Sequence, residues 1–181
     1  MKITILNGNP EASSLDDYLA QLKIYLEVKG DAVTQLDLRT MKISYCVGCW
    51  NCWVKTPGQC SSNDQSLDVC RAVIHSDLTL WASPVIMGFP SALLKKVTDK
   101  LIPLVHPYIV VDQGEAHHLA RYDHYPQFGL LLEKNGDCDD EDIEIIRHIF
   151  SRTALNMKSE LAFTRLASDP IQEVSDAVNH L

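Results

Sequence analysis

The sequence lacks any apolar run long enough to cross a membrane. Its longest apolar runs fall far below the roughly 18 residues that a transmembrane helix needs. The opening residues, MKITILNGNP, are too short an apolar run for a signal peptide. The tripeptide N-x-[ST], which marks N-glycosylation in secreted proteins, is also absent. We therefore expect a cytoplasmic protein that does not act at a membrane.

Positive charge is scarce as well. The chain has 16 Lys and Arg against 24 Asp and Glu, which gives a formal net charge of -8. A basic stripe for nucleic acid, or for an anionic membrane surface, is therefore not expected. The 181 residues are 46% hydrophobic and 22% charged, as is usual for a globular chain with one core. We expect one domain that spans residues 1–181.

Strand and helix patterns alternate along the chain. Buried-type or alternating strands are predicted at 2–6, 32–38, 78–82, 128–132 and 161–166, and apolar positions at helical spacing follow each of them. Five β-α units of this kind favour a parallel sheet covered by helices on both faces. We predict an α/β, flavodoxin-like three-layer sandwich with a five-stranded parallel sheet in the order 2-1-3-4-5. Residues 44–62 form a cysteine-rich loop in this prediction, and residues 105–127 an irregular loop.

The cysteine-rich loop carries the most informative motif. Four cysteines occur within fifteen residues: Cys46, Cys49, Cys52 and Cys60. Six cysteines in a cytoplasmic chain indicate metal or redox chemistry rather than a disulfide scaffold. Four closely spaced thiolates can bind an iron–sulfur cluster, and Trp50 and Trp53 could shield it. A free or redox-active dithiol set and a zinc site are the alternatives.

The first strand-to-helix turn, residues 7–15, resembles an anion site. Neither G-x-G-x-x-G nor the P-loop lysine motif occurs in the chain, which disfavours classical dinucleotide and ATP sites. A single phosphate held by Asn9, Ser13 and Ser14 fits the turn instead. The alternative is an ordinary turn in which Ser13 or Ser14 caps the helix. Glu11 argues against an anion because it adds negative charge.

A second ligand-binding segment is predicted after the third strand. Residues 83–88 are Ser83, Pro84, Val85, Ile86, Met87 and Gly88. Ligands of open α/β sheets bind at the carboxyl ends of such central strands. Val85, Ile86 and Met87 could supply an apolar wall against a flat ring, although an ordinary loop that packs into the core gives the same pattern.

Titratable and aromatic side chains gather in the stretch 105–127. They are His117, His118, Arg121, Tyr122, His124 and Tyr125. Such a group can bind a substrate or move protons. A solvated loop or a contact between subunits is the alternative.

Together these motifs resemble the NAD(P)H-dependent FMN reductase family, and within it the iron–sulfur flavoproteins. The opening strand with residues 7–10 is similar to the family's N-G-S-P phosphate loop. The cysteine motif with Asp64 follows, and then residues 83–88 with Leu94, Lys95 and Asp99, in the order and spacing that the family shows. Glu11 and Ile86 depart from the family pattern, which has a basic and an aromatic residue there.

The resemblance implies an FMN-dependent NAD(P)H oxidoreductase with an unknown electron acceptor. FMN would contact Asn9, Ser13, Ser14 and Leu15, and its ring would lie against residues 83–88. A 4Fe–4S cluster on Cys46, Cys49, Cys52 and Cys60 would make the chain an electron-transfer flavoprotein. The alternatives are a flavodoxin-like electron carrier without enzymatic activity and a zinc-stabilised interaction module. The long loop and its aromatic residues favour a homodimer or higher homo-oligomer.

Overall fold

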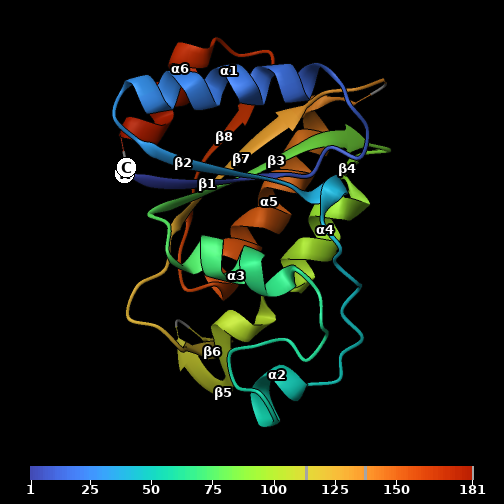
Figure 1. Cartoon of the computed structure of the whole chain (residues 1–181), viewed down its shortest axis with the longest axis vertical. Coiled ribbons are helices and arrows are strands. Elements are labelled where there is room, and N and C mark those ends of the chain that lie inside the picture. The colour runs from blue at the N-terminus through green and yellow to red at the C-terminus, as the bar shows by residue number, and fades with distance from the viewer. Residues whose placement is uncertain (113, 137, 181) are drawn as a thin grey trace.

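A parallel sheet forms the centre of the molecule (Figure 1). The computed structural model describes residues 1–112, 114–136 and 138–180. Parallel strands lie in the order β2-β1-β3-β7-β8. Their bounds are Lys2–Asn7 for β1, Ala32–Asp37 for β2, Leu78–Ile86 for β3, Gln127–Glu133 for β7 and Leu161–Leu166 for β8. This is the predicted order 2-1-3-4-5, so the flavodoxin-like fold class is confirmed.

Helices cover both faces of the sheet (Figure 1). Helices α1 (Ser14–Val28) and α6 (Ile171–Asn179) pack on one face, where Leu15, Leu19, Leu22 and Leu26 of α1 are fully buried. Helices α3 (Ser66–Ile74), α4 (Ala92–Asp99) and α5 (Asp140–Asn156) pack on the other. The short elements are the 3-10 turns η1 (Leu38–Thr40) and η2 (Ile102–Leu104) and the helix α2 (Asn51–Val54). The apolar spacing of each long helix therefore matches the face that it buries.

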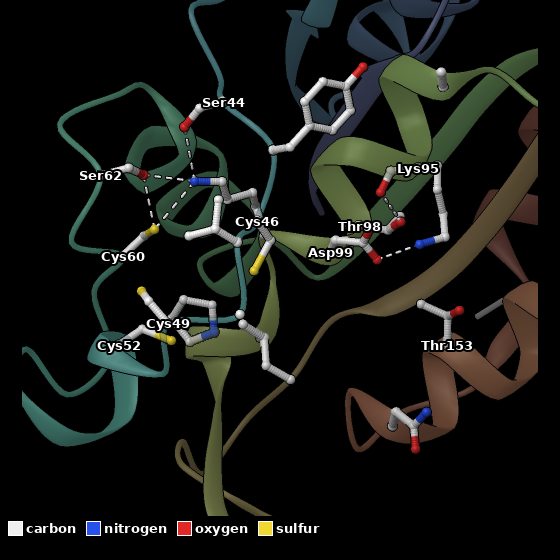
Figure 2. A pocket seen from close by; sticks show the side chains of 18 of the residues that line it. Ser44, Cys46, Cys49, Cys52, Cys60, Ser62, Lys95, Thr98, Asp99 and Thr153 are labelled. Carbon is white, nitrogen blue, oxygen red and sulfur yellow. Dashed lines mark hydrogen bonds and ion pairs between the residues drawn. The ribbon is translucent and has the colours of Figure 1, made fainter.

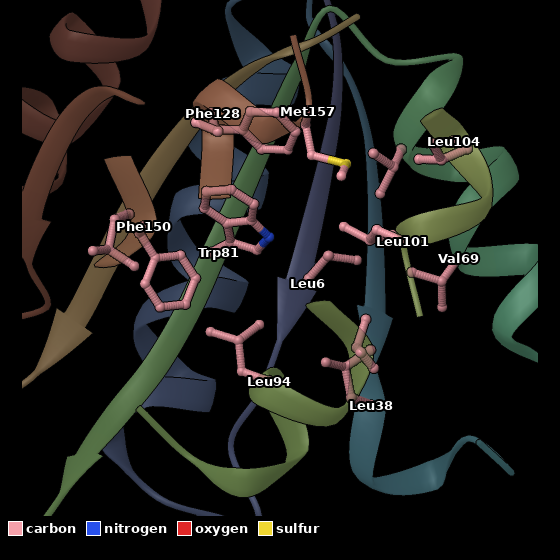
Figure 3. Packing of buried hydrophobic residues seen from close by; sticks show 14 of the residues in the cluster. Leu6, Leu38, Val69, Trp81, Leu94, Leu101, Leu104, Phe128, Phe150 and Met157 are labelled. Atoms are coloured by element: carbon pink, nitrogen blue, oxygen red, sulfur yellow. The ribbon is translucent and has the colours of Figure 1, made fainter. Parts of the chain in front are cut away.

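Stacked aromatic rings fill the core between the sheet and α5 (Figure 3). The Trp81 ring of β3 lies parallel to the Phe128 ring of β7, with 4.2 Å between centroids. The Phe150 ring of α5 meets Trp81 edge-on at 4.8 Å. All three side chains are buried, and such ring pairs stabilise a core beyond the area that they bury. This packing holds β3 and β7 against α5. The carboxyl ends of these two strands carry the candidate site.

Two predicted boundaries differ from the structure. Strand β3 continues past Ala82 to Ile86, and it turns back into the short antiparallel strand β4 (Phe89–Pro90). The expectation that residues 105–127 are irregular is wrong for most of them, because β5 (Val105–Asp112) and β6 (Glu115–Ala120) form an antiparallel hairpin. Five residues of β5 in a row, 108–112, are exposed, so its sequence has no two-residue alternation. Among the described residues, no helix is both long and apolar enough to span a membrane.

Candidate functional site

The two predicted ligand-binding segments meet at one edge of the sheet. Asn7 at the end of β1 pairs with Ala82 of β3, and the Gly8 N–H donates to the Ala82 carbonyl at 2.8 Å. Pro84 of β3 pairs in turn with Glu133, the last residue of β7. The first turn and residues 83–88 therefore lie side by side at the carboxyl ends of neighbouring strands, where open α/β sheets bind ligands.

Ser13 begins helix α1 as its N-cap. Its hydroxyl accepts from the Leu15 N–H at 3.3 Å, and Asp16 completes a capping box with Ser13. Leu15 is fully buried, so it offers no side chain to a ligand. The buried Asn9 amide donates to Ser13 Oγ at 2.9 Å and to Asp16 Oδ2 at 3.0 Å. The helix-cap alternative is thus confirmed for Ser13, and the two serine hydroxyls remain the exposed donors of the turn.

A carboxylate of the chain itself lies against these hydroxyls. Ser14 Oγ donates to Glu133 Oε1 at 2.6 Å, and Ser13 Oγ donates to Glu133 Oε2 at 3.4 Å. Glu133 was not among the residues predicted from the sequence. The signal was its position as the first charged residue after the apolar run 128–132, at the end of a strand that neighbours β3.

Further acidic charge surrounds the same turn. Asp16 Oδ1 accepts from Asn7 at 2.7 Å and from Arg39 at 2.8 Å. Partial burial raises the pKa of Asp16, but the hydrogen bonds from Arg39 and Asn7 outweigh it, so the net pKa is lowered. Glu11 is exposed. The turn therefore has hydroxyls that can donate hydrogen bonds to an anion. Carboxylates of the chain itself already accept these hydrogen bonds.

Residues 83–88 divide into a buried and an exposed half. Ser83 is buried, where its Oγ donates to the Pro84 carbonyl and accepts from the Ser91 N–H, both at 2.8 Å. Val85 is buried as well. Ile86 and Met87 are 43% and 96% exposed, and Met87 has a φ of 51° in the tight turn from β3 to β4. The tip of this turn is the part that a flat ring could contact.

A cavity of about 1330 Å³ lies beside this turn, between the cysteine loop on one side and helices α4 and α5 on the other (Figure 2). Its lining is mostly apolar. Of the ten predicted flavin-binding residues, all of which the structure describes, Ile86 alone lines the cavity. The cysteines that line it are Cys46, Cys49, Cys52 and Cys60. The structure therefore groups the thiols with the turn at Ile86 and not with the serine hydroxyls.

The four thiols lie at one end of the cavity (Figure 2). All are free: Cys46 and Cys49 are exposed, Cys60 is partly exposed and Cys52 is buried. Burial raises the pKa of the Cys52 thiol, and the negative charge of the other three raises it further. Within residues 1–112, 114–136 and 138–180, no group of three or more His, Cys, Asp or Glu is placed to hold a metal ion. Of the other cysteines, Cys70 is buried in the core, and Cys138 is partly exposed.

A buried lysine lies beside the Cys60 thiol. Lys100 follows α4, and its side chain is 4% exposed. Its Nζ is 2.7 Å from Ser62 Oγ and 3.4 Å from both Cys60 Sγ and Ser44 Oγ, the three labelled partners in Figure 2. It also lies 3.3 Å from Asp64 Oδ2. We refer to Ser44, Cys60, Ser62, Asp64 and Lys100 as the Lys100 cluster. The cluster could not be predicted from the sequence, because its other four residues lie 36 to 56 residues from Lys100 along the chain.

Charge in the Lys100 cluster is held by hydrogen bonds. Burial raises the pKa of Cys60, but the bonds with Ser62 and Lys100 outweigh it, so its net pKa is lowered. Burial likewise opposes ionisation of Asp64, yet donors from Ser44 and Ser66 hold the pKa of its carboxyl well below the usual range. Burial lowers the pKa of Lys100, and its hydrogen bonds to Cys60 and Asp64 more than compensate. The cluster therefore places the buried ammonium group of Lys100 at the edge of the cavity.

The β5–β6 hairpin is tied to the cysteine loop by side chains that bond to backbone carbonyls. Trp53 Nε1 donates to the Val105 carbonyl at 2.9 Å. Arg121 donates to the same carbonyl and to that of Pro103, and the Tyr125 hydroxyl donates to that of Leu104. Arg121 and Tyr125 belong to the group for which the sequence left open substrate binding, proton transfer, a solvated loop or a subunit contact, and in the structure they hold backbone carbonyls of residues 103–105. The His118 ring lies 4.9 Å from that of Trp53.

Fold and strand-end geometry define a flavodoxin-like α/β protein. The family model of NADPH-dependent FMN reductases matches residues 1–116, which is more than half of the chain. The chain belongs to this family, as the sequence motifs predicted.

Relatives of known type support the same assignment. An iron–sulfur flavoprotein of Archaeoglobus fulgidus is 35% identical over 110 residues, which cover 59% of this chain and 48% of that protein. An iron–sulfur flavoprotein of Clostridioides difficile is 29% identical over 107 residues, which cover 55% of this chain and 45% of that protein. The match thus spans about half the length of these curated relatives, at 48% and 45%.

Solved structures show the fold at lower identity. The NAD(P)H:quinone oxidoreductase of Methanothermobacter marburgensis has a TM-score of 0.69 at 15% identity, covering 99% of this chain and 93% of that one. An azoreductase of Bacillus anthracis has a TM-score of 0.66 at 13% identity, covering 99% and 92%.

Proposed function

We propose that this chain is an FMN-dependent NAD(P)H oxidoreductase with an electron acceptor still to be identified. One observation carries the proposal: the serine turn at α1 and the exposed tip at Ile86 to Gly88 lie at adjacent strand ends of a fold that belongs to the FMN reductase family. Family membership supports a flavin and a pyridine nucleotide as ligands. The neighbouring strand ends support the position that we propose for the flavin.

The residues at this edge suit a flavin mononucleotide. The hydroxyls of Ser13 and Ser14 already donate to an anion, the Glu133 carboxylate, so their orientation suits anionic oxygen. In the proposal they hold the phosphate, Asn9 orients Ser13, and Ile86, Met87 and Gly88 contact the ring. Bound FMN would accept a hydride from NAD(P)H and pass the electrons on. The apolar cavity beside the tip would keep water from that ring and leave room for a second planar molecule.

Flavin titration tests the proposal. FMN should bind more tightly than FAD, because the turn has no dinucleotide glycine motif. Met87→Asp should weaken FMN binding at least about tenfold by placing a charge against the ring. Val28→Asp is the matched control, because Val28 is also exposed, at 83%, and lies at the far end of α1. Absence of flavin binding, or equal loss in both variants, would contradict the proposed site. NAD(P)H oxidation by the flavin-loaded protein separates an enzyme from an electron carrier, which would show none.

The 4Fe–4S cluster on the four cysteines stays a prediction. The position of all four thiols around one cavity favours the cluster. Two observations disfavour it: among the described residues no three ligand side chains are placed to hold a metal ion, and the Lys100 ammonium lies beside Cys60. Iron and sulfide analysis after anaerobic reconstitution decides the matter. Iron that is lost in each of Cys46→Ser, Cys49→Ser, Cys52→Ser and Cys60→Ser, but kept in Cys138→Ser, would establish the cluster. Zinc without iron would favour the interaction module, and no metal would leave a dithiol set.

Self-association forms part of the proposal. Exposed apolar side chains line the cavity, namely Val47, Trp50, Ile86 and Phe89, and Met87 next to Ile86 is exposed as well. Such patches are typical of contacts between subunits. Sedimentation analysis should therefore show a homodimer or a higher homo-oligomer, and a monomer at micromolar concentration would contradict this.

A further inference from the structure

Glu133 lies where the flavin phosphate of the proposed function would bind. Its two carboxylate oxygens accept from the hydroxyls of Ser14 and Ser13, at 2.6 Å and 3.4 Å. Its backbone pairs with Pro84, so it stands between the serine turn and the ring-binding segment. We infer that Glu133 is a built-in competitor of the phosphate, and that this chain binds riboflavin about as tightly as FMN. The inference rests on the proposed flavin site.

The charge balance around the turn supports this inference. Residues 7–17 and 83–91 contain no Lys or Arg, while residues 7–17 contain Glu11, Asp16 and Asp17. Arg39, which reaches the turn from η1, is paired with Asp16 at 2.8 Å. Lys134, the neighbour of Glu133, is paired with Asp140 at 2.6 Å. The cations on the side chains next to the turn are therefore already neutralised, and an added phosphate meets net negative charge.

Exchange of one anion for another explains why the phosphate adds little affinity. To admit a phosphate, the partly exposed Glu133 side chain must leave the hydroxyls, which then donate to the phosphate instead. The hydrogen bonds gained equal those lost, and repulsion between Glu133 and the phosphate remains. Riboflavin has the same ring and ribityl chain but no phosphate, so it needs no such exchange.

The experiment compares FMN and riboflavin in equilibrium titrations. For the wild type, the two dissociation constants should agree within about threefold. Glu133→Gln keeps the size of the side chain and removes its charge, so the Kd for FMN should fall about tenfold or more at low salt. The Kd for riboflavin should change less than twofold. Asp17→Asn is the matched control, because it removes one exposed carboxylate of the first α1 turn without touching the serine hydroxyls, and it should change neither Kd more than about threefold.

Inorganic phosphate provides a readout that needs no flavin. Millimolar phosphate should raise the melting temperature of the Glu133→Gln variant above that of the same variant in chloride, and should leave the wild type unchanged. Equal FMN affinity in the wild type and Glu133→Gln overturns the inference, as does a wild type that already prefers FMN tenfold. Failure of every variant to bind any flavin would refute the proposed function. In that case the equality of riboflavin and FMN falls with it, and the phosphate shift alone decides whether Glu133 competes with phosphate; no shift in Glu133→Gln would overturn that as well.

Discussion

Replacement of the buried lysine provides the sharpest stability test. Lys100→Met keeps the unbranched chain and removes the ammonium, which leaves the Asp64 carboxylate without its cation. The side chains of this pair are 4% and 10% exposed, so water cannot fully replace the lost partner. Breaking a buried pair typically costs 3–5 kcal/mol, and we expect about 3 kcal/mol here. The lower end applies because Asp64 also accepts hydrogen bonds from Ser44 and Ser66.

The chain offers a matched control on α4, the helix that Lys100 follows. Lys95 and Asp99 form an ion pair whose side chains are 59% and 50% exposed. Lys95→Met should therefore cost less than about 0.5 kcal/mol. Urea unfolding at pH 7, followed by tryptophan fluorescence, to which the buried Trp81 contributes, measures both free energies of unfolding.

A double-mutant cycle isolates the pair itself. Asp64→Asn with Lys100→Met should be less destabilised than the sum of the two single variants, because the second change removes the uncompensated charge. A Lys100→Met variant that costs no more than Lys95→Met would refute the assignment of a buried ion pair. Additive single effects would do the same.

Three further predictions concern stability. Gly129→Ala should cost about 1–3 kcal/mol, since a Cβ there would lie 2.4 Å from the Phe163 ring, and Phe163→Leu should recover part of the loss in urea unfolding. Asp139→Ala should cost about 1 kcal/mol because Asp139 caps α5 by accepting from the Asp142 N–H, and thermal melts of this variant and an exposed control, Asp68→Ala, test it. The lowered pKa of Asp64 stabilises the fold above its unfolded pKa of about 3.9, and that contribution is lost as the pH falls further. Urea midpoints of Asp64→Asn should therefore depend less on pH below about 4 than those of the wild type, and parallel curves would contradict this.

The sheet could be predicted from the sequence because its strands have distinct signatures. Residues 128–132, and residues 78–82 apart from Thr79, are apolar runs, which is typical of central parallel strands with both faces covered. The hairpin β5–β6 has no such signature, because its apolar residues 109–111 are exposed in succession. Its pairing depends on contacts with Trp53 and Tyr125 that local sequence cannot show.

The candidate site could be predicted by segment but not by contact. Residues 7–15 and 83–88 meet as expected, since parallel strands bring their carboxyl ends to one edge. Glu133 lies 119 residues from Ser14, and Lys100 lies 40 residues from Cys60, so no spacing rule connects them. The four cysteines that their spacing predicted to act as one set line one cavity, whereas the positions of their sulfurs depend on side chains from elsewhere.

The three consecutive carbonyls of residues 103–105 have a consequence for local unfolding. They accept from Trp53 of the cysteine loop and from Arg121 and Tyr125 beyond the hairpin. Trp53 and Arg121 share the Val105 carbonyl, so both segments are attached to residues 103–105, and an opening of these residues releases both. Backbone amides of α2 and of β6 should therefore exchange with deuterium at similar opening free energies, as one cooperative unit at the edge of the molecule.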